Sequence, residues 1–347
     1  MATGGFKDSV LLSAIGLMDK KFNSKELRKP VFGAETAFLE KRGMLIPSVD
    51  AIRKAEQQTV RADYLERNAV AIGSTRSCTP SAYYGDTGTL DLSWTTYSHT
   101  AKTSIKIAEN NTYDQLVLFQ NDIYNRFVDL HTQIEADAVA YLEANRTGIQ
   151  GNRTMNTWDG GADVMRVALA DRDDYLNYIK TEMYQDNYRG TLMDIHTIPM
   201  MAMYRQQFAQ GASNDENLQF QYPGFQHYDS AAITNGTGSV YGTSYIVEEG
   251  GIALLDWIPA INRNGNESKK GEVWTTMPDP FGYPLTWAVF ITDGCADTTY
   301  STGTDPKGAT QDYVRTYEFS VDLSFNRAPL TVNAGQEVIN KYVLMTV

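Results

Sequence analysis

The chain has 347 residues, of which 42 are acidic and 30 are basic, so its formal net charge at pH 7 is −12. Hydrophobic residues make up 42% and charged residues 21%, which is typical of a folded protein and excludes extensive disorder. A chain with this balance does not attract nucleic acid as a whole, because phosphate binding requires clustered lysine and arginine. No stretch reaches the roughly 20 apolar residues that cross a bilayer. The two cysteines, Cys78 and Cys295, lie far apart and indicate a reducing compartment without a disulfide framework.

Residues 1–67 are predicted to form a helix-prone N-terminal arm. Four apolar residues near its start recur at helical spacing, namely Val10, Leu11, Ile15 and Met18. This spacing predicts a short amphipathic helix, and the absence of a cleavage pattern after it argues against a signal peptide. Residues 49–66 are expected to continue as a helix or an extended arm.

A segment of low charge follows the arm. Residues 69–100 are rich in Ser, Thr, Gly and Tyr and contain few charged side chains. Bulky residues alternate with a period of two, first at Leu90, Leu92 and Trp94 and then at Thr103, Ile105 and Ile107. Because this period is that of a strand, we expect a long loop or hairpin over residues 68–100 that passes into strands.

The clearest structural signal is a long amphipathic helix over Thr112–Arg146, a region without Pro or Gly. Apolar residues recur there at spacings of three and four, at Leu116, Phe119, Ile123, Phe127, Leu130, Ile134, Ala138 and Leu142. Thr112 or Asp114 is expected to cap the start of the helix and Gly148 to stop it. At about 1.5 Å per residue, such a helix would span roughly 50 Å and act as a beam.

The remaining chain alternates between helices and strands, which predicts an α+β fold. Helices are expected at 175–188 and 200–210, and strands at 191–196, 218–222, 239–247 and 252–258. The C-terminal part shows period-two alternation at Tyr317, Phe319, Val321, Leu323 and Phe325, with a further strand at 342–347.

No pattern in the sequence indicates catalysis, a cofactor or a metal. The four histidines, His99, His131, His196 and His227, are scattered without a ligand motif, and each is interpreted as a surface or core residue. The helix carries Asp122, Asp129, Glu135 and Asp137, which we interpret as its solvated face. We therefore predict no catalytic, cofactor-binding or metal-binding residues.

The order of these elements resembles that of the major capsid proteins of tailed double-stranded-DNA bacteriophages. The resemblance lies in the low-charge loop, the strands of residues 89–110, the long helix, the strand–Pro–helix unit of residues 192–211 and the alternating run of residues 314–332. It implies an N-terminal arm at 1–67 and an extended loop at 68–100. It also implies a peripheral domain from 101–155 and 310–347, with a spine helix at 112–147, and an axial domain at 156–309.

The resemblance further implies a structural protein, not an enzyme, that assembles into hexamers and pentamers of an icosahedral or prolate shell around double-stranded DNA. Such a shell is assembled in the bacterial cytoplasm and would have a separate scaffolding protein, a portal and cement proteins as possible partners, without sequence-specific DNA binding or a membrane. Some members of the family crosslink subunits through a Lys on the extended loop, and no Lys lies between Lys54 and Lys102 here.

Contact with a neighbouring subunit is expected on the low-charge segment, since buried charges there would carry a desolvation cost. The candidate contact residues are Tyr83, Tyr84, Leu92 and Trp94. Two alternatives stay open. One is an encapsulin-type compartment, which would package a protein cargo instead of DNA. The other is an extracellular glycan-binding protein that uses the Tyr and Trp clusters.

Overall fold

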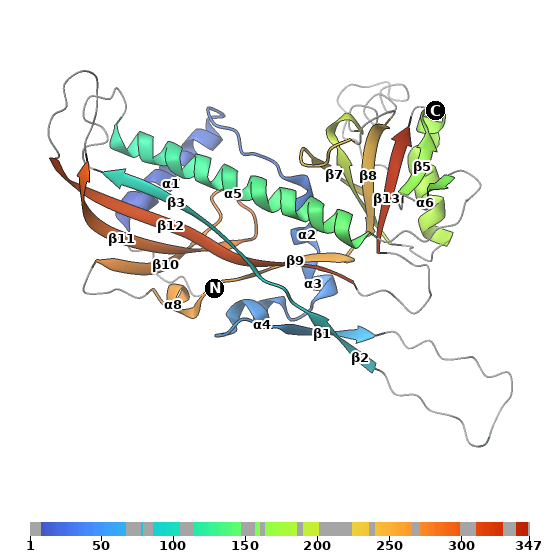
Figure 1. Ribbon diagram of the computed structural model, residues 1–347, viewed down its shortest axis with the longest axis horizontal. Helices are drawn as coiled ribbons and strands as arrows, with labels where there is room; N and C mark the ends of the chain where they lie inside the picture. Colours follow the sequence, from blue (N-terminus) through green and yellow to red (C-terminus); the bar gives the residue numbers. More distant parts are fainter. Residues whose placement is uncertain are drawn as a thin grey trace.

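The protein is an elongated α+β structure in which one long helix runs from a five-stranded sheet toward a six-stranded sheet (Figure 1). A two-stranded hairpin projects from the body (Figure 1). The computed structural model describes residues 8–66, 78, 86–104, 114–146, 157–159, 164–185, 190–200, 224–235, 240–265, 271–298, 310–328 and 338–345. Among these residues, no helix combines the length and apolar character that crossing a bilayer requires.

The long helix is α5 (Gln115–Asn145), and it confirms the helix predicted over residues 112–146. Its apolar stripe is buried, because residues three and four apart share one face of a helix. Asp114 occupies the N-cap position but its side chain makes no capping hydrogen bond, and the predicted stop at Gly148 lies outside the described residues. The buried apolar residues are Phe119, Ile123, Phe127, Leu130, Ile134, Ala138 and Leu142.

The five-stranded sheet packs against this stripe. It contains β3 (Thr95–Ser104), β9 (Ile252–Trp257), β10 (Glu272–Pro278), β11 (Thr286–Thr298) and β12 (Thr310–Arg327). Tyr317 and Phe319 of β12 face the helix, where their rings lie 4.8 Å from Phe119 and 5.0 Å from Phe127, measured between centroids. The predicted alternation in this segment is therefore confirmed, since successive side chains of a strand point to opposite faces.

The six-stranded sheet has the order β4–β5–β13–β8–β6–β7, and α6 (Tyr175–Gln185) packs on one of its faces. Its strands are β4 (Thr157–Asp159), β5 (Val164–Ala168), β6 (Leu192–Thr197), β7 (Phe225–Ser230), β8 (Val240–Glu248) and β13 (Ile339–Met345). A short 3-10 helix, Leu169–Asp174, precedes α6. The strands predicted near β6, β8 and β13 are confirmed. The strand predicted at 218–222 and most of the helix at 200–210 lie outside the described residues.

Four strands belong to a different sheet from the one that the predicted domain ranges imply. β13 was expected with the peripheral strands, but it lies between β5 and β8 in the six-stranded sheet. Conversely, β9, β10 and β11 fall within the predicted axial range of 156–309 but belong to the five-stranded sheet with β12. The reason is that periodicity identifies a strand and its buried face but does not identify its partner.

The described part of the N-terminal segment packs on its own chain. α1 (Ser9–Asn23), the helix predicted from Val10 to Met18, lies along α5, and Asp8 caps it by accepting from the backbone N–H groups of Val10 and Leu11. Arg315 of β12 also binds Asp8, with 2.8 Å between Nη1 and Oδ2. The next helices, α2 (Gly33–Glu40), α3 (Arg42–Leu45) and α4 (Val49–Lys54), contact β9, and α2 also contacts α5 and β7.

A buried charge cluster fixes α2 to α5. The imidazole of His131 on α5 lies 2.8 Å from Glu35 of α2 through Nδ1 and 2.8 Å from Asp279 through Nε2, and all three side chains are fully buried. Burial alone would lower the pKa of His131, but Glu35 and Asp279 raise it to about 10, so the imidazole is charged at neutral pH. His131 therefore serves as the buried cation of the core, stacked against Phe32.

Glu135, one turn further along α5, is also buried. Its carboxylate accepts the backbone N–H groups of Ala34 and Glu35 at the start of α2 and the hydroxyl of Ser230. The prediction that Glu135 belongs to a solvated face is therefore wrong. The error has a physical cause, because the carboxylate satisfies unpaired N–H groups of a helix that is distant in sequence.

The packing of α5 on β12 can be tested with Phe127→Ala. Phe127 is fully buried against Trp287, Phe281 and Phe319, so the cavity should lower the free energy of unfolding by about 3–5 kcal/mol. Asn125→Ala on the exposed side of the same helix is the control and should change it by less than about 0.5 kcal/mol. Urea unfolding followed by circular dichroism measures both, and equal effects of the two variants would contradict the packing.

The charge cluster makes a prediction about pH. The folded chain keeps a proton on His131 that the unfolded chain releases near its ordinary pKa of 6.5, so this contribution is complete below about pH 6.5 and disappears as the pH rises through about 10. His131→Leu leaves Glu35 and Asp279 without their cation and should cost about 3–5 kcal/mol at neutral pH.

Urea unfolding at about pH 7 and about pH 9 separates the pH-dependent contribution of the His131 proton from the cost of removing the side chain. The unmodified chain should lose stability between these values, and His131→Leu should lose less. His99→Gln on β3 is the matched control and should keep the slope of the unmodified chain. An identical slope in His131→Leu would show that His131 carries no excess proton in the folded state.

Candidate assembly surfaces

The β1–β2 hairpin is a separate two-stranded sheet that projects from the body (Figure 1). β1 (Arg61–Glu66) and β2 (Asp86–Asp91) pair antiparallel from Arg61 opposite Asp91 to Glu66 opposite Asp86, and they extend away from both larger sheets (Figure 1). Arg61 and Asp91 form an exposed ion pair at 3.0 Å between Nε and Oδ1. A two-stranded ribbon is at best marginally stable alone in water, so this hairpin gains stability from any surface that covers it.

The root of the hairpin is held firmly by its own chain. A root cluster of buried apolar residues joins the hairpin to α4 and β9, and it comprises Ile46, Val49, Ile52, Ala62, Leu92, Ala253 and Leu255. The indole ring of Trp94 packs beside this cluster, and its N–H donates to the carbonyl of Thr59 at 2.8 Å. Buried contacts within the same chain therefore fix the base of the hairpin to the body.

The four predicted contact residues have different positions. Leu92 is buried in the root cluster, with 7% of its surface exposed, and half-buried Trp94 packs against that cluster. Leu92 and Trp94 therefore help to anchor the hairpin within the chain, and their role in contacts between copies stays a prediction. Tyr83 and Tyr84 lie outside the described residues. The period-two signal at Leu90, Leu92 and Trp94 identified a buried face but could not show whether that face meets its own chain or another.

Buried charges reinforce the root. Asp256 of β9 accepts from Arg42 at 2.8 Å and from Arg53 at 2.9 Å, and its carboxylate is only 4% exposed. Asp322 of β12 accepts from Gln58 and from Thr96 on β3. These bonds connect the segment before the hairpin to both β9 and β12, which fixes the direction in which the hairpin points.

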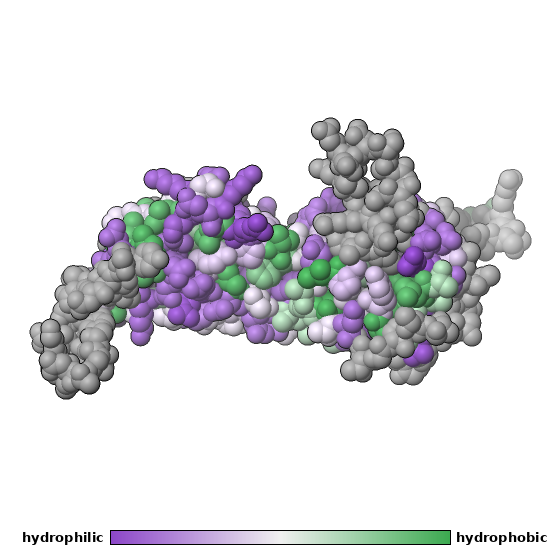
Figure 2. Space-filling model, turned by 90° about the horizontal axis from the view of Figure 1, so that it is seen from above, coloured by the Kyte–Doolittle hydropathy of each residue, from purple (hydrophilic) through white to green (hydrophobic). Residues whose placement is uncertain are grey.

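Apolar side chains also reach the surface elsewhere. Among the large apolar side chains that the structure describes, the most exposed are Val31 at 74%, Val60 at 68% and Met44 at 61%. A surface groove of about 370 Å³ lies beside the hairpin root, between α4 and β1. Figure 2 shows apolar patches among hydrophilic side chains along the length of one face. A surface of this mixed kind does not by itself mark an interface, because interfaces that form reversibly are about as apolar as the rest of a protein surface.

The carboxylates on α5 that were expected on a solvated face mostly have structural partners. Asp122 pairs with Arg126, Asp137 accepts from the hydroxyl of Tyr97, and Asp129 lies 3.5 Å from His99. These contacts tie the outer side of α5 to itself and to β3. They provide charge pairing on a helix surface rather than an acid–base pair over a substrate cleft.

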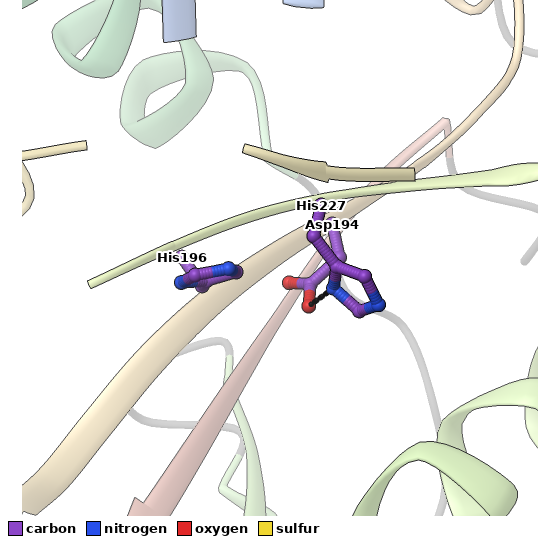
Figure 3. Close-up of side chains that lie close together, drawn as sticks. All are labelled: Asp194, His196 and His227. Carbon is purple, nitrogen blue, oxygen red and sulfur yellow. Dashed lines mark hydrogen bonds and ion pairs between the residues drawn. The ribbon is translucent and has the colours of Figure 1, made fainter. Parts of the chain in front are cut away.

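One group of possible metal ligands is assembled by the fold. Asp194 and His196 of β6 and His227 of β7 bring their ligand atoms within 4.8 Å of one another (Figure 3). No local sequence motif marks this group, because its ligands come from two strands that are distant in sequence. The alternation of Asp194 and His196 on a strand is a usable signal, but His227 joins them only through strand pairing.

No protein-family model and no curated protein matches the chain. Among solved structures, the chain is similar to one from Mycobacterium phage Cain, with a TM-score of 0.46, 12% identity and 94% of each chain covered. It is similar to one from Mycobacterium phage Adephagia, with a TM-score of 0.45, 12% identity and coverage of 94% of this chain and 93% of that chain. It is also similar to the capsid of Ralstonia phage GP4, with a TM-score of 0.45, 10% identity and 92% of each chain covered. With TM-scores below 0.5, these are similarities of overall arrangement, and the function has to be argued from the geometry of the chain itself.

Proposed function

We propose that this chain is a shell-building subunit, the major capsid protein of a tailed double-stranded-DNA bacteriophage. The observation that carries the proposal is the β1–β2 hairpin, a two-stranded ribbon on a fixed root that projects from an elongated body. A single chain gains little from such an element, whereas a neighbouring copy can cover it. The order of loop, strands and long helix in the sequence supports the same function.

In this proposal, each hairpin lies on the next copy around a ring. A contact between two different surfaces of identical subunits is head-to-tail. Repeating it produces a closed ring when the rotation between neighbouring copies divides a full turn. Rings of six and five copies would then tile an icosahedral or prolate shell. The α5 helix keeps the two larger sheets at a fixed separation, so that each copy presents the same surfaces to its neighbours.

The charge of the chain fits a container for DNA. A net charge of −12 provides no general attraction for phosphate, so packed DNA would not adhere to the shell wall or be read by sequence. The proposed role is structural and not enzymatic, and the location is the virion after assembly in the bacterial cytoplasm. A separate scaffolding protein, a portal and cement proteins are the expected partners.

The five-stranded sheet with α5 corresponds in this proposal to the peripheral domain. The six-stranded sheet with α6 corresponds to the axial domain, which would meet its copies around the centre of each ring. Stability would come from many interfaces of roughly 1,600 Å² acting together, because the segment between Lys54 and Lys102 has no lysine for a covalent crosslink.

Assembly is tested by expressing the full chain, alone and with a candidate scaffolding protein, and examining it by size-exclusion chromatography and electron microscopy. Rings or closed shells are expected. A variant in which residues 64–88 are replaced by a short Gly-Ser linker should keep its circular dichroism spectrum and remain monomeric. Shortening the segment 266–270, which lies between β9 and β10 in the sequence, is the control and should leave assembly intact.

Two outcomes would contradict the proposal. A full chain that stays monomeric at every concentration, with and without the scaffolding protein, would exclude a shell-forming function. Shells formed equally well by the linker variant would show that the hairpin does not carry the contact between copies.

A further inference from the structure

A buried group of metal-ligand type lies in the six-stranded sheet, away from the hairpin. β6 and β7 pair in parallel, and Asp194 stands directly opposite His227 in their register. His196 follows Asp194 by two positions on β6, so both side chains point to the same face of the sheet. Asp194 and His196 are fully buried, and the His227 side chain is 5% exposed. Figure 3 shows the three side chains on one side of the two strands.

The hydrogen bonds of this group prepare it for a cation. His196 has its Nδ1 atom 3.0 Å from the carbonyl oxygen of Thr197, so Nδ1 donates to that oxygen and Nε2 is the nitrogen suited to coordinate a cation. A backbone carbonyl that fixes the tautomer in this way is the usual support of a metal-binding histidine. The Nδ1 atom of His227 lies 3.0 Å from Oδ2 of Asp194, which places a second imidazole nitrogen beside the carboxylate.

Polar groups on neighbouring elements continue the site. Ser244 of β8 is opposite His196 in the register of the sheet and is fully buried. Tyr175 at the start of α6 is buried and lies close enough to interact with both Asp194 and Ser244. The described face of the sheet below α6 is largely apolar, with Leu192, Phe225 and Ile246 in one core cluster, and buried Asn340 of β13 contacts Met183 of α6. A buried carboxylate in such surroundings is stabilised by a cation beside it.

We propose that Asp194, His196 and His227 form a binding site for a divalent transition metal ion, with Zn²⁺ as the best match. Two imidazole nitrogens and one carboxylate oxygen are donors that Zn²⁺ prefers, whereas Ca²⁺ and Mg²⁺ require mostly oxygen ligands. Zn²⁺ binds such atoms at about 2.0–2.2 Å, so ligands now within 4.8 Å must converge by about 1 Å, which side-chain rotation on fixed strands provides.

Binding is balanced in protons. When the ion takes the place of the Nδ1 proton of His227 beside Asp194, an imidazolium releases that proton to solvent, whereas a neutral imidazole keeps it on Nε2. Three protein ligands leave one position of a tetrahedral ion for water. The ion would join β6 to β7, the last strand of the described sheet, and so stabilise this edge. This site is independent of the proposed capsid function, and failure of either leaves the other standing.

The first experiment uses the unmodified full chain. After dialysis against a chelator, the chain is equilibrated with Zn²⁺, separated by gel filtration and analysed by mass spectrometry for metal content. About one zinc per chain and a higher unfolding temperature with zinc are expected. Co²⁺ in place of Zn²⁺ should give the visible absorption of a four-coordinate ion. Less than about one zinc per ten chains, without a Co²⁺ spectrum, would overturn the proposal.

The second experiment uses variants of similar shape, namely Asp194→Asn, His196→Gln and His227→Gln, with His99→Gln as the matched control on β3. Each of the three should weaken zinc binding at least about tenfold and abolish the Co²⁺ spectrum, and the control should keep both. Zinc binding that persists unchanged in all three would place the ion elsewhere and overturn the proposal. Where a variant does not fold, the Co²⁺ spectrum of the unmodified chain decides.

Discussion

The apolar stripe of α5 packs along β12, and the positions of the other elements depend on that contact. Phe119 and Phe127 meet Tyr317 and Phe319 over the five-stranded sheet. Near the other end of the helix, Glu143 binds the hydroxyl of Tyr245 and the ammonium of Lys341, both from the six-stranded sheet. One helix therefore contacts both sheets, and its stiffness sets how they stand to one another. If α5 bent, the hairpin root on β9 and β12 would no longer keep a fixed direction relative to the six-stranded sheet.

Buried charges complement this apolar contact by fixing the N-terminal helices in place around it. The His131 cluster holds α2 because Glu35 of that helix is a counter-charge to the imidazolium. Backbone N–H groups at the start of α2 also donate to the carboxylate of Glu135. At the root of the hairpin, the buried carboxylate of Asp256 binds Arg42 and Arg53 in the same way. A buried ion pair adds little net stability compared with an apolar pair, but leaving one partner alone is costly. Such pairs therefore specify a single arrangement of the N-terminal helices on the body.

The sequence predicts the elements of this fold better than it predicts their partners. The α5 helix and β12 follow from periodicity, because each buries one regular face along its whole length. Pairing depends on registers between distant segments, so the sheet that contains β13 could not be derived, and β10 and β11 were not predicted. The same limit applies to the sites. Alternation shows that one face at Leu92 is apolar but not which chain covers it, and Leu92 packs against its own chain. The grouping of His227 with Asp194 depends on the parallel pairing of β6 and β7.

The straightness of α5 is the central claim, and a distance between its two ends tests it most directly. Spin labels on cysteines introduced at Asn121 and Ala140, both exposed, would be measured by double electron–electron resonance after Cys78 and Cys295 are replaced by serine. An unbroken helix predicts one narrow distribution with a backbone separation of about 28 Å. The same distance is expected before and after assembly. A broad distribution, or a clearly shorter distance, would show that this region bends and would contradict the account.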